Sequence, residues 1–335
     1  MNLKGTALLI TAAIMLFSPG FLMISNYANN DMLSVFLMLH SVYLTILWYQ
    51  EPKLVNIISI AAAFVLGMLS KLSAWMAAIP IAVIFLTALI HELKEKNLKE
   101  FGRLVGQMSA FLLIAAPLSL YWSIRNYLRF GVPIAYIPAA DNTYQHIDVS
   151  PVQRIFDFNI QQFKEPYVCE VYYSSYNEYN PLIALLKSAS TNVAYAQKNF
   201  NLIFLIPNHL ALWTGIILAA AALVCMIVIL VKRNSISVPA KIVIAASYVV
   251  ILASYYIFCV KYPDVCTENI RYASQLIYIG ALSVGIVLQK LHDRKNRKYL
   301  FFRRFLITSS AVFCFASALL FSADGLWISL YYNLL

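Results

Sequence analysis

The segment 8–48 decides the fold, because two apolar runs at 8–24 and 32–48 flank the seven residues SNYANND at 25–31. An apolar helix of about 20 residues crosses the roughly 30 Å hydrocarbon layer of a bilayer. The short polar segment contains three Asn residues and Asp31, whereas the runs on either side are almost free of charge. The pattern predicts a membrane hairpin in which Asp31 is either a solvated turn residue or part of a site.

The composition of the whole chain extends this membrane assignment. The chain has 335 residues, of which 61% are hydrophobic and 12% charged, whereas soluble domains have about 25% charged residues. An all-α polytopic membrane protein is therefore expected, since each spanning helix satisfies its own backbone polar groups. The net charge is +10, but the basic residues cluster between apolar runs and form no aromatic-interleaved stripe. The expected partner is therefore the lipid bilayer and not a nucleic acid.

The apolar runs predict about nine transmembrane helices. They lie near 5–24, 32–49, 54–70, 73–91, 105–127, 209–231, 240–260, 272–289 and 305–322. Most Lys and Arg residues fall in the connections on the same side as Lys4, which by the positive-inside rule is the cytoplasmic side. The prediction is a multi-pass plasma-membrane protein with a cytoplasmic N-terminus and an extracytoplasmic C-terminus. It consists of helices one to five (1–127), one large extracytoplasmic loop region (128–208), and helices six to nine with a short outer C-terminal segment (209–335).

The loop region 128–208 is polar and rich in tyrosine, with Tyr167, Tyr172, Tyr173, Tyr176 and Tyr179 close together. Connections of this length are usually functional or disordered, and the aromatic content argues against disorder. Such tyrosines either stack on sugar rings or lie at a membrane interface. The stretch NPLIALLK (180–187) predicts a short amphipathic helix on the outer surface. Cys169 and Cys266 both fall in predicted outer loops, where a disulfide is one option.

Charged residues gather at the predicted outer ends of the helices. The cations are Lys71, Arg125, Lys261 and Arg271, and the acids are Asp31, Asp264 and Glu268. Outer cations run against the positive-inside bias, and a phosphate or pyrophosphate held at the outer leaflet would explain them. Snorkelling of long basic side chains is the alternative. The chain has no Gly-rich phosphate loop, HExxH motif or nucleophile elbow, and its Cys and His spacing predicts no metal site.

Four motifs in order along the chain resemble a known enzyme family. They are SNYANND (25–31), GMLSKLSAW (67–75), YWSIRNYLRFGVP (121–133) and CTENIRY (266–272). They resemble bacterial relatives of the protein O-mannosyltransferases, which are GT-C-type integral membrane glycosyltransferases of the phospholipid carrier-dependent class. That class also includes the aminoarabinose transferases of lipid A. The resemblance implies transfer of a sugar from a polyprenyl-phosphate donor to an acceptor at the outer membrane face. It implies no cofactor beyond this donor substrate and leaves a divalent metal open.

In such an enzyme an acidic residue acts as general base while basic residues hold the lipid phosphate. Matched by position, Asn30-Asp31 corresponds to the family's Asn-Asp at the start of a membrane helix, and Lys71 to the lysine after its Gly-containing helix. The polar pair that ends a span matches Arg125-Asn126, and the Arg-Tyr that opens a late helix matches Arg271-Tyr272. The resemblance thus implies a secondary catalytic acid at Asp31 and substrate binding by Asn30, Lys71, Arg125, Asn126, Arg271 and Tyr272.

One departure from the family pattern keeps alternatives open. The catalytic acid of the family normally lies in a first outer loop, but no long loop with an acidic pair precedes SNYANND. The chain therefore resembles an N-terminally truncated member. A catalytically incomplete remnant or partner subunit is the second expectation, and a transporter of lipid-linked sugars is the third. Transporters place ionisable residues near the bilayer midplane, whereas here they gather at one face, which favours the first two.

Overall fold

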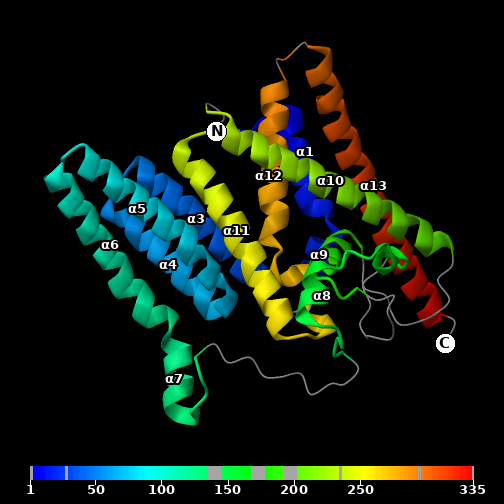
Figure 1. The fold of residues 1–335 in the computed structure, drawn as a ribbon, viewed down its shortest axis with the longest axis horizontal. Coiled ribbons are helices and arrows are strands. Elements are labelled where there is room, and N and C mark those ends of the chain that lie inside the picture. Colours follow the sequence, from blue (N-terminus) through cyan, green and yellow to red (C-terminus); the bar gives the residue numbers. More distant parts are fainter. Residues whose placement is uncertain are drawn as a thin grey trace. The chain divides into compact units, whose positions relative to one another are not determined.

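The computed structural model describes residues 3–26, 29–134, 145–166, 178–191, 202–233, 236–292, 294 and 296–333. Helices account for almost all regular structure in these residues, and the described part of the chain contains no β-strand (Figure 1). The only β-type pairing described is an isolated bridge between His146 and Asp264. The predicted all-α class is confirmed.

The long helices are α1 (Gly5–Phe17), α3 (Asp31–Gln50), α4 (Leu54–Ser70), α5 (Ala78–Lys94), α6 (Leu98–Ser119), α10 (Leu202–Val231), α11 (Val238–Lys261), α12 (Gln275–Leu291) and α13 (Arg297–Asn333). The shorter helices are α2 (Pro19–Asn26), α7 (Tyr121–Phe130), α8 (Pro151–Phe156) and α9 (Pro181–Ser190). Four short 3₁₀ helices complete the description: η1 (Leu72–Ala77), η2 (Ile160–Phe163), η3 (Val265–Thr267) and η4 (Ile270–Tyr272).

Six of the described helices are long and apolar enough to cross a membrane, or seven if α1 and α2 count as one bent span. These two helices meet at an angle of 59°, directly before Pro19, which has no backbone N–H to continue the ladder. Two further apolar helices, α4 and α12, have 17 residues each and are shorter than the six. α5 has the same length, but η1 and α5 together form one span of 23 residues, Leu72–Lys94. A polytopic membrane protein is therefore supported, and the number nine stays a prediction.

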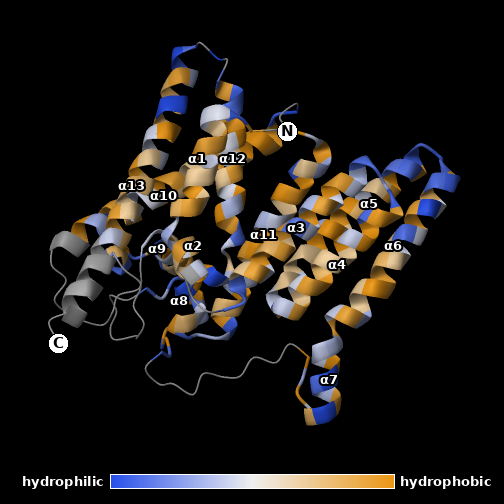
Figure 2. Ribbon diagram, turned by 180° about the vertical axis from the view of Figure 1, so that it is seen from behind, coloured by the Kyte–Doolittle hydropathy of each residue, from blue (hydrophilic) through white to orange (hydrophobic). Residues whose placement is uncertain are grey.

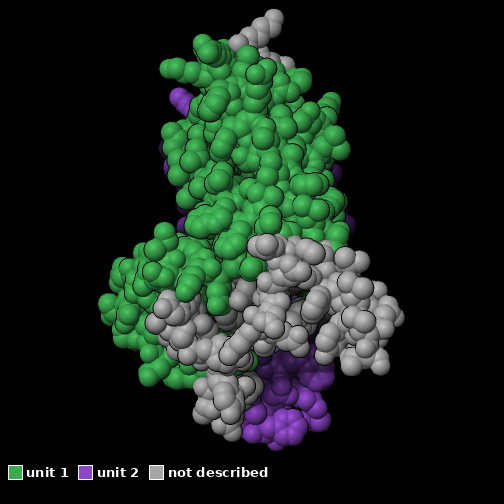
Figure 3. All heavy atoms as spheres, turned by 90° about the vertical axis from the view of Figure 1, so that its right-hand side faces the viewer, with its two compact units in different colours: residues 1–27, 140–232, 255–335 green, residues 28–139, 233–254 purple. Residues whose placement is uncertain are grey.

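The chain divides into two compact units, which Figure 3 shows in different colours. Unit 1 comprises residues 1–27, 140–232 and 255–335, and unit 2 comprises residues 28–139 and 233–254. The first part of α11 therefore belongs to unit 2, and its end from Tyr255 belongs to unit 1.

Unit 2 is built on the α3–α4 hairpin, with α5 and α6 packed against it. Its core centres on Trp48, which is fully buried and packs edge-on against Phe85 at a ring-centroid distance of 4.8 Å. The indole Nε1 of Trp48 donates a hydrogen bond of 2.7 Å to Gln107 of α6. These helices are mostly hydrophobic in the colours of Figure 2, and large hydrophobic side chains such as Leu66, Leu86 and Leu113 are exposed on them, which suits contact with lipid chains.

The helix expected at 105–127 is two helices instead. α6 starts earlier, at Leu98, and ends at Ser119, after which α7 forms a separate amphipathic helix. The break follows Pro117, which lies in the last turn of α6 and lacks a donor for the helical ladder. At its far end α7 stops at Gly131, whose φ of 66° gives the left-handed C-terminal cap that glycine favours.

Unit 1 combines an apolar helix bundle with a polar cap. In the bundle α1 packs on α12 and α13, and α10 packs on α12 and α13. The cap consists of residues 145–166, 178–191 and 262–272, and it contains α8, α9 and the short helices η2, η3 and η4. It lies at the start of α12, whereas the first residues of α1 lie at the end of α12. With 17 residues, α12 separates these two ends of unit 1 by about 25 Å.

Candidate functional site

The start of α3 and the end of α4 meet in unit 2 through an ion pair. Lys71 Nζ donates to Oδ1 of Asp31. The side chain of Asp31 is 2% exposed, whereas that of Lys71 is 22% exposed. The acid is thus enclosed by the protein, and the lysine can still be reached from outside.

The positions of Asp31 and Lys71 at helix ends explain why they form an ion pair. Asp31 occupies the first turn of α3, and Lys71 is the residue that caps the end of α4. Helix dipoles favour an anion at an N-terminus and a cation at a C-terminus, so both charges suit their positions. In a hairpin the start of one helix and the end of its antiparallel neighbour share one side, which brings together residues forty positions apart in sequence.

A second contact between the same helix ends holds this geometry. The side-chain amide of Asn30 donates to the backbone oxygen of Ser70, and the Ser70 hydroxyl donates to the backbone oxygen of Asn30 at 3.3 Å. The Asn29 side chain accepts a hydrogen bond from the backbone N–H of Asp31 at 3.0 Å. Close packing supports these contacts, since a Cβ on Gly67 would lie 3.3 Å from that of Ala74 and 3.4 Å from that of Leu37.

Arg125 and Asn126, which the sequence also assigns to the site, lie on α7. Arg125 donates to the Asn126 side chain at 3.0 Å. Its guanidinium lies 5.1 Å from the centroid of the Trp122 ring and 5.8 Å from that of Phe130. α7 buries none of its residues. Arg125 therefore lies beside two aromatic rings on an exposed helix. No described contact links it to Asp31 or Lys71.

Arg271 and Tyr272 belong to unit 1, whereas the other five predicted site residues belong to unit 2. They belong to η4, which is capped by Asn269, whose side chain accepts a hydrogen bond from the N–H of Arg271. The Arg271 guanidinium lies 5.0 Å from the centroid of the Tyr272 ring, and Tyr272 packs against Phe258 at 4.7 Å. Arg271 is exposed. The assignment of these two residues to one site with Lys71 stays a prediction.

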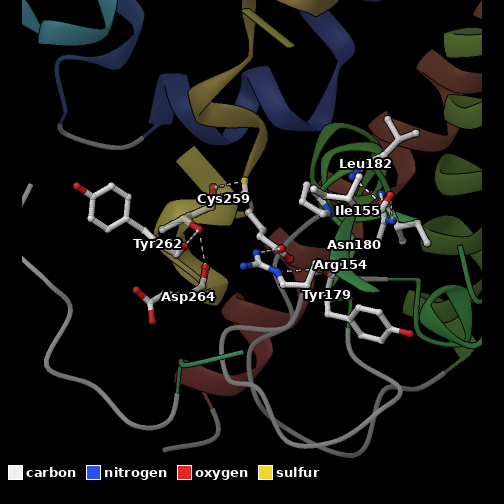
Figure 4. A network of polar contacts seen from close by, with 12 residues as sticks. Arg154, Ile155, Tyr179, Asn180, Leu182, Cys259, Tyr262 and Asp264 are labelled. Carbon is white, nitrogen blue, oxygen red and sulfur yellow. Dashed lines mark hydrogen bonds and ion pairs between the residues drawn. The ribbon is translucent and has the colours of Figure 1, made fainter. Parts of the chain in front are cut away.

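The cap of unit 1 contains a buried ionic network that the sequence does not predict (Figure 4). Arg154 of α8 forms an ion pair with Glu268, and both side chains are 1% exposed. Lys187 of α9 forms another with Glu178, at 0% and 2% exposure. Arg154 also donates to the backbone oxygen of Tyr179 at 3.3 Å. The ion pair with Glu268 joins the first segment of the cap to the third. The bonds of Arg154 to Tyr179 and of Lys187 Nζ to the backbone oxygen of Gln162 join the first segment to the second.

Amide side chains complete the cap. Gln162 accepts hydrogen bonds from the backbone N–H groups of Tyr179 at 3.0 Å and Asn180 at 2.9 Å. Asn180 in turn caps α9 by accepting from Leu182 N and Ile183 N. The hydroxyl of Ser188 accepts from Ile270 N at 2.8 Å, which fixes η4 against α9. The cap therefore sets the position of the segment that carries Arg271.

The structure corrects two expectations from the sequence, the exposure of Glu268 and the surface position of the helix at 180–187. Glu268 was expected beside the outer cations, but it is buried and paired with Arg154. Burial raises the pKa of Glu268 to about 7, because desolvation outweighs the opposing effect of Arg154, and the nearby Glu178 raises it further. The helix expected on the surface at 180–187 exists as α9, but it is largely buried, including Lys187. Its charge is tolerated inside because Glu178 compensates it.

Tyr179 fits neither role expected for the tyrosine cluster. Its ring is buried in the cap, and its hydroxyl donates to Asp157. The other four tyrosines lie outside the described residues, as does Cys169, so the disulfide with Cys266 stays a prediction. Asp264 lies 3.6 Å from His146, as measured between Oδ1 and Nδ1.

Sequence reasoning missed Arg154, Glu178 and Lys187. A usable signal existed for Lys187, which is the single charge in the otherwise apolar stretch PLIALLKSAS. Arg154 has no comparable pattern, because its partner Glu268 lies 114 positions away in sequence. Glu178 lies nine positions before Lys187, but nothing in the sequence between them indicates the pair. No group of three or more His, Cys, Asp or Glu side chains suited to a metal occurs in the described part of the chain.

Comparison with known proteins gives one match. Residues 2–122 match the family described as dolichyl-phosphate-mannose-protein mannosyltransferase. This segment is about a third of the chain and contains Asn30, Asp31 and Lys71, whereas Arg125 and Arg271 lie outside it. No curated protein and no solved structure matched the chain. The match supports a mannosyltransferase-like membrane glycosyltransferase in general.

Proposed function

We propose that the chain transfers a sugar from a polyprenyl-phosphate donor to an acceptor at the outer face of the membrane. The observation that carries the proposal is the ion pair of buried Asp31 with reachable Lys71, inside the segment that matches the mannosyltransferase family. A cation held at a membrane helix end by an enclosed acid suits the phosphate of a lipid carrier, because Lys binds phosphate as a point charge.

The proposed reaction needs a proton acceptor and a stabilised leaving group. The acceptor hydroxyl gives its proton to a carboxylate, its oxygen forms a bond to the anomeric carbon, and the bond from that carbon to the phosphate oxygen breaks. The polyprenyl phosphate then leaves with additional negative charge. Lys71 would stabilise that charge, as fixed cations do for developing anions, and Asp31 would hold Lys71 in place near the donor head group. Asn30, Arg125, Asn126, Arg271 and Tyr272 are the proposed remaining substrate contacts.

The test is a sugar-transfer assay with membranes that contain only this chain and a labelled polyprenyl-phosphate sugar. Lys71→Met should lower the rate about 100-fold or more, the usual effect of losing one group that stabilises transition-state charge. The matched control is Lys53→Met. Lys53 forms an exposed ion pair with Glu51 at the opposite end of the same two helices, so its loss should leave the rate unchanged. Equal rates for Lys71→Met and the unmodified chain would refute the assignment of the site.

A second function, donor binding without transfer, is favoured by one observation. Among the described residues of unit 2, Asp31 is the only acid at the end that carries Lys71, since Glu51, Glu92, Glu95 and Glu100 lie at the other helix ends. The Asp31 carboxylate is buried and already forms an ion pair with Lys71, so the described part of unit 2 offers no second carboxylate at this end to take the proton of an acceptor hydroxyl. The alternative is thus a catalytically incomplete remnant or partner subunit. Saturable binding of the labelled donor by purified chain, without turnover in the assay above, would favour it.

A further inference from the structure

A cavity of about 130 Å³ opens at the end of unit 1 that lies farthest from the cap along α12. The start of α1, the end of α12 and the first turns of α13 line it, and its longer polar side chains are those of Lys4, Gln289, His292 and Arg303. One water molecule needs about 10–15 Å³ on this measure. The cavity is therefore large enough for a polyatomic group.

The cavity is strongly basic. No ion pair described in the structure involves Lys4, His292 or Arg303, although each lines it. The nearby sequence KLHDRKNRKYLFFRR (290–304) contains seven Lys or Arg residues and a single acid, and no acid occurs before Asp31. Three helices that are distant in sequence thus direct basic groups at one space. Snorkelling alone predicts that such side chains spread outward, so their convergence calls for a shared anionic ligand.

The backbone around the cavity also favours an anion. The N–H of Lys4 donates to the Gln289 side chain at 2.9 Å, which fixes the start of α1 beside the end of α12. Gly5 then turns the chain with a φ of 52°, and a Cβ at this position would meet no atom within 4 Å. The first N–H groups of α1 have no partner within the helix, and Gly5, Thr6 and Ala7 all line the cavity.

We infer that this cavity binds a phosphate group, either the head group of an anionic phospholipid or a free phosphate. Basic pockets between membrane helices on the cytoplasmic side bind anionic lipid head groups, and the positive-inside rule predicts that this end of unit 1 is cytoplasmic. The bound phosphate joins α1, α12 and α13 at this end. The site lies about 25 Å along α12 from the cap and is independent of the sugar-transfer proposal.

The experiment uses the purified full chain with its lipids exchanged. In one arm the protein is placed in nanodiscs of phosphatidylcholine with or without phosphatidylglycerol. In the other it is kept in detergent with inorganic phosphate or with chloride at equal ionic strength. The melting temperature and the affinity for the anion are measured in each. We expect phosphatidylglycerol or phosphate to raise the melting temperature by several degrees. If the melting temperature rises with phosphatidylglycerol but not with inorganic phosphate, the ligand is a lipid head group. If it rises with inorganic phosphate but not with phosphatidylglycerol, the ligand is a free phosphate.

Variants distinguish a built site from general surface charge. Arg303→Gln and His292→Gln should each lower the affinity for the anion about tenfold or more, the usual effect of losing a hydrogen bond to a charged group. The matched control is Arg304→Gln, because Arg304 is the exposed neighbour of Arg303 and does not line the cavity. Equal losses for Arg303→Gln and Arg304→Gln would overturn the proposal. The proposal would also be overturned if neither phosphatidylglycerol nor phosphate raised the melting temperature of the unmodified chain. That result does not depend on whether the variants fold.

Discussion

Lys71 and Asp31 form an ion pair in which only the lysine is reachable: 22% of the lysine side chain is exposed, against 2% of the aspartate. Asp31 is enclosed and cannot be solvated by water, so its charge depends on Lys71 for compensation. A charge that is removed from water is costly unless an opposite charge compensates it. The exposed partner can take up a second anion while it keeps the first. This asymmetry is the physical reason for assigning ligand contact to Lys71 and a positioning role to Asp31.

The asymmetry predicts a large loss of stability when only the lysine is removed. Lys71→Met leaves the Asp31 carboxylate buried without its compensating charge, and breaking a buried pair in this way costs about 3–5 kcal/mol. The double variant Asp31→Asn/Lys71→Met should recover most of the loss, because no uncompensated charge remains. Unfolding in detergent followed by circular dichroism measures both. If the single and double variants were equally unstable, the pair would not be the source of the effect.

Much of this part of the molecule could be predicted from the sequence, because a membrane hairpin is a local structure. The apolar run expected at 54–70 coincides with α4, and α3 begins at Asp31, one residue before the expected start. In a hairpin the start of one span and the end of the next share a side, so the proximity of Asp31 and Lys71 follows from helix order alone.

The cap could not be predicted in the same way. Its ion pair between Arg154 and Glu268 joins residues 114 positions apart, and no periodic pattern in its short helices indicates such a partner. The apolar sequence around Lys187 predicted a helix correctly but not its burial, because burial of a lysine depends on where its counter-ion lies. Tertiary contacts, and not local preferences, determine this region.

Removal of Arg154 should open the cap in a pH-dependent manner. Arg154→Met removes the charge that holds down the pKa of the buried Glu268. At pH 8 the carboxyl group must then either stay charged without its partner or take up a proton, which we expect to cost up to about 3–5 kcal/mol. At pH 5 the carboxyl group is protonated, and the cost should be smaller. Hydrogen exchange of α8 and α9, measured by mass spectrometry at both pH values, reports the opening. Unchanged protection of both helices at pH 8 would contradict the structural role of the pair.

The raised pKa of Glu268 predicts that the intact protein loses stability as the pH rises. Burial raises this pKa from 4.5 to about 7 in the folded state, so between these values the folded state binds more protons than the unfolded state. The free energy of unfolding therefore falls from about pH 4.5 to about pH 7, and the contribution of Glu268 is constant above that. The charged neighbours in the network are Arg154 and Glu178.

Glu268→Gln isolates this effect, because glutamine has the same shape and does not titrate. The melting temperature of the unmodified chain should fall between pH 5 and pH 7 more steeply than that of the variant. Parallel curves for the two proteins would show that Glu268 does not titrate differently in the folded and unfolded states.

Close packing of α2 against the cap predicts that Gly20 tolerates no side chain. A Cβ at this position would lie 2.7 Å from Ile270 Cγ2, 3.1 Å from the backbone oxygen of Ser188 and 3.2 Å from the Cα of Ala189. Two of these atoms are backbone atoms of α9, which cannot move without disturbing the helix. We therefore expect Gly20→Ala to cost about 1–3 kcal/mol, the usual effect of overpacking.

The matched control for Gly20→Ala is Gly106→Ala in the membrane helix α6, where an added Cβ meets no atom within 4 Å. This substitution should be neutral or should stabilise the protein by up to about 1 kcal/mol, because alanine favours a helix more than glycine does. Gly20→Ala should lower the free energy of unfolding, whereas Gly106→Ala should leave it unchanged or raise it. This difference distinguishes the effect of overpacking from that of helix propensity. Because Ile270 begins η4, Gly20→Ala should also displace Arg271 and lower the affinity for the lipid-linked donor, whereas Gly106→Ala should not. Equal melting temperatures and equal donor affinities for the two variants would show that α2 does not hold η4 in place.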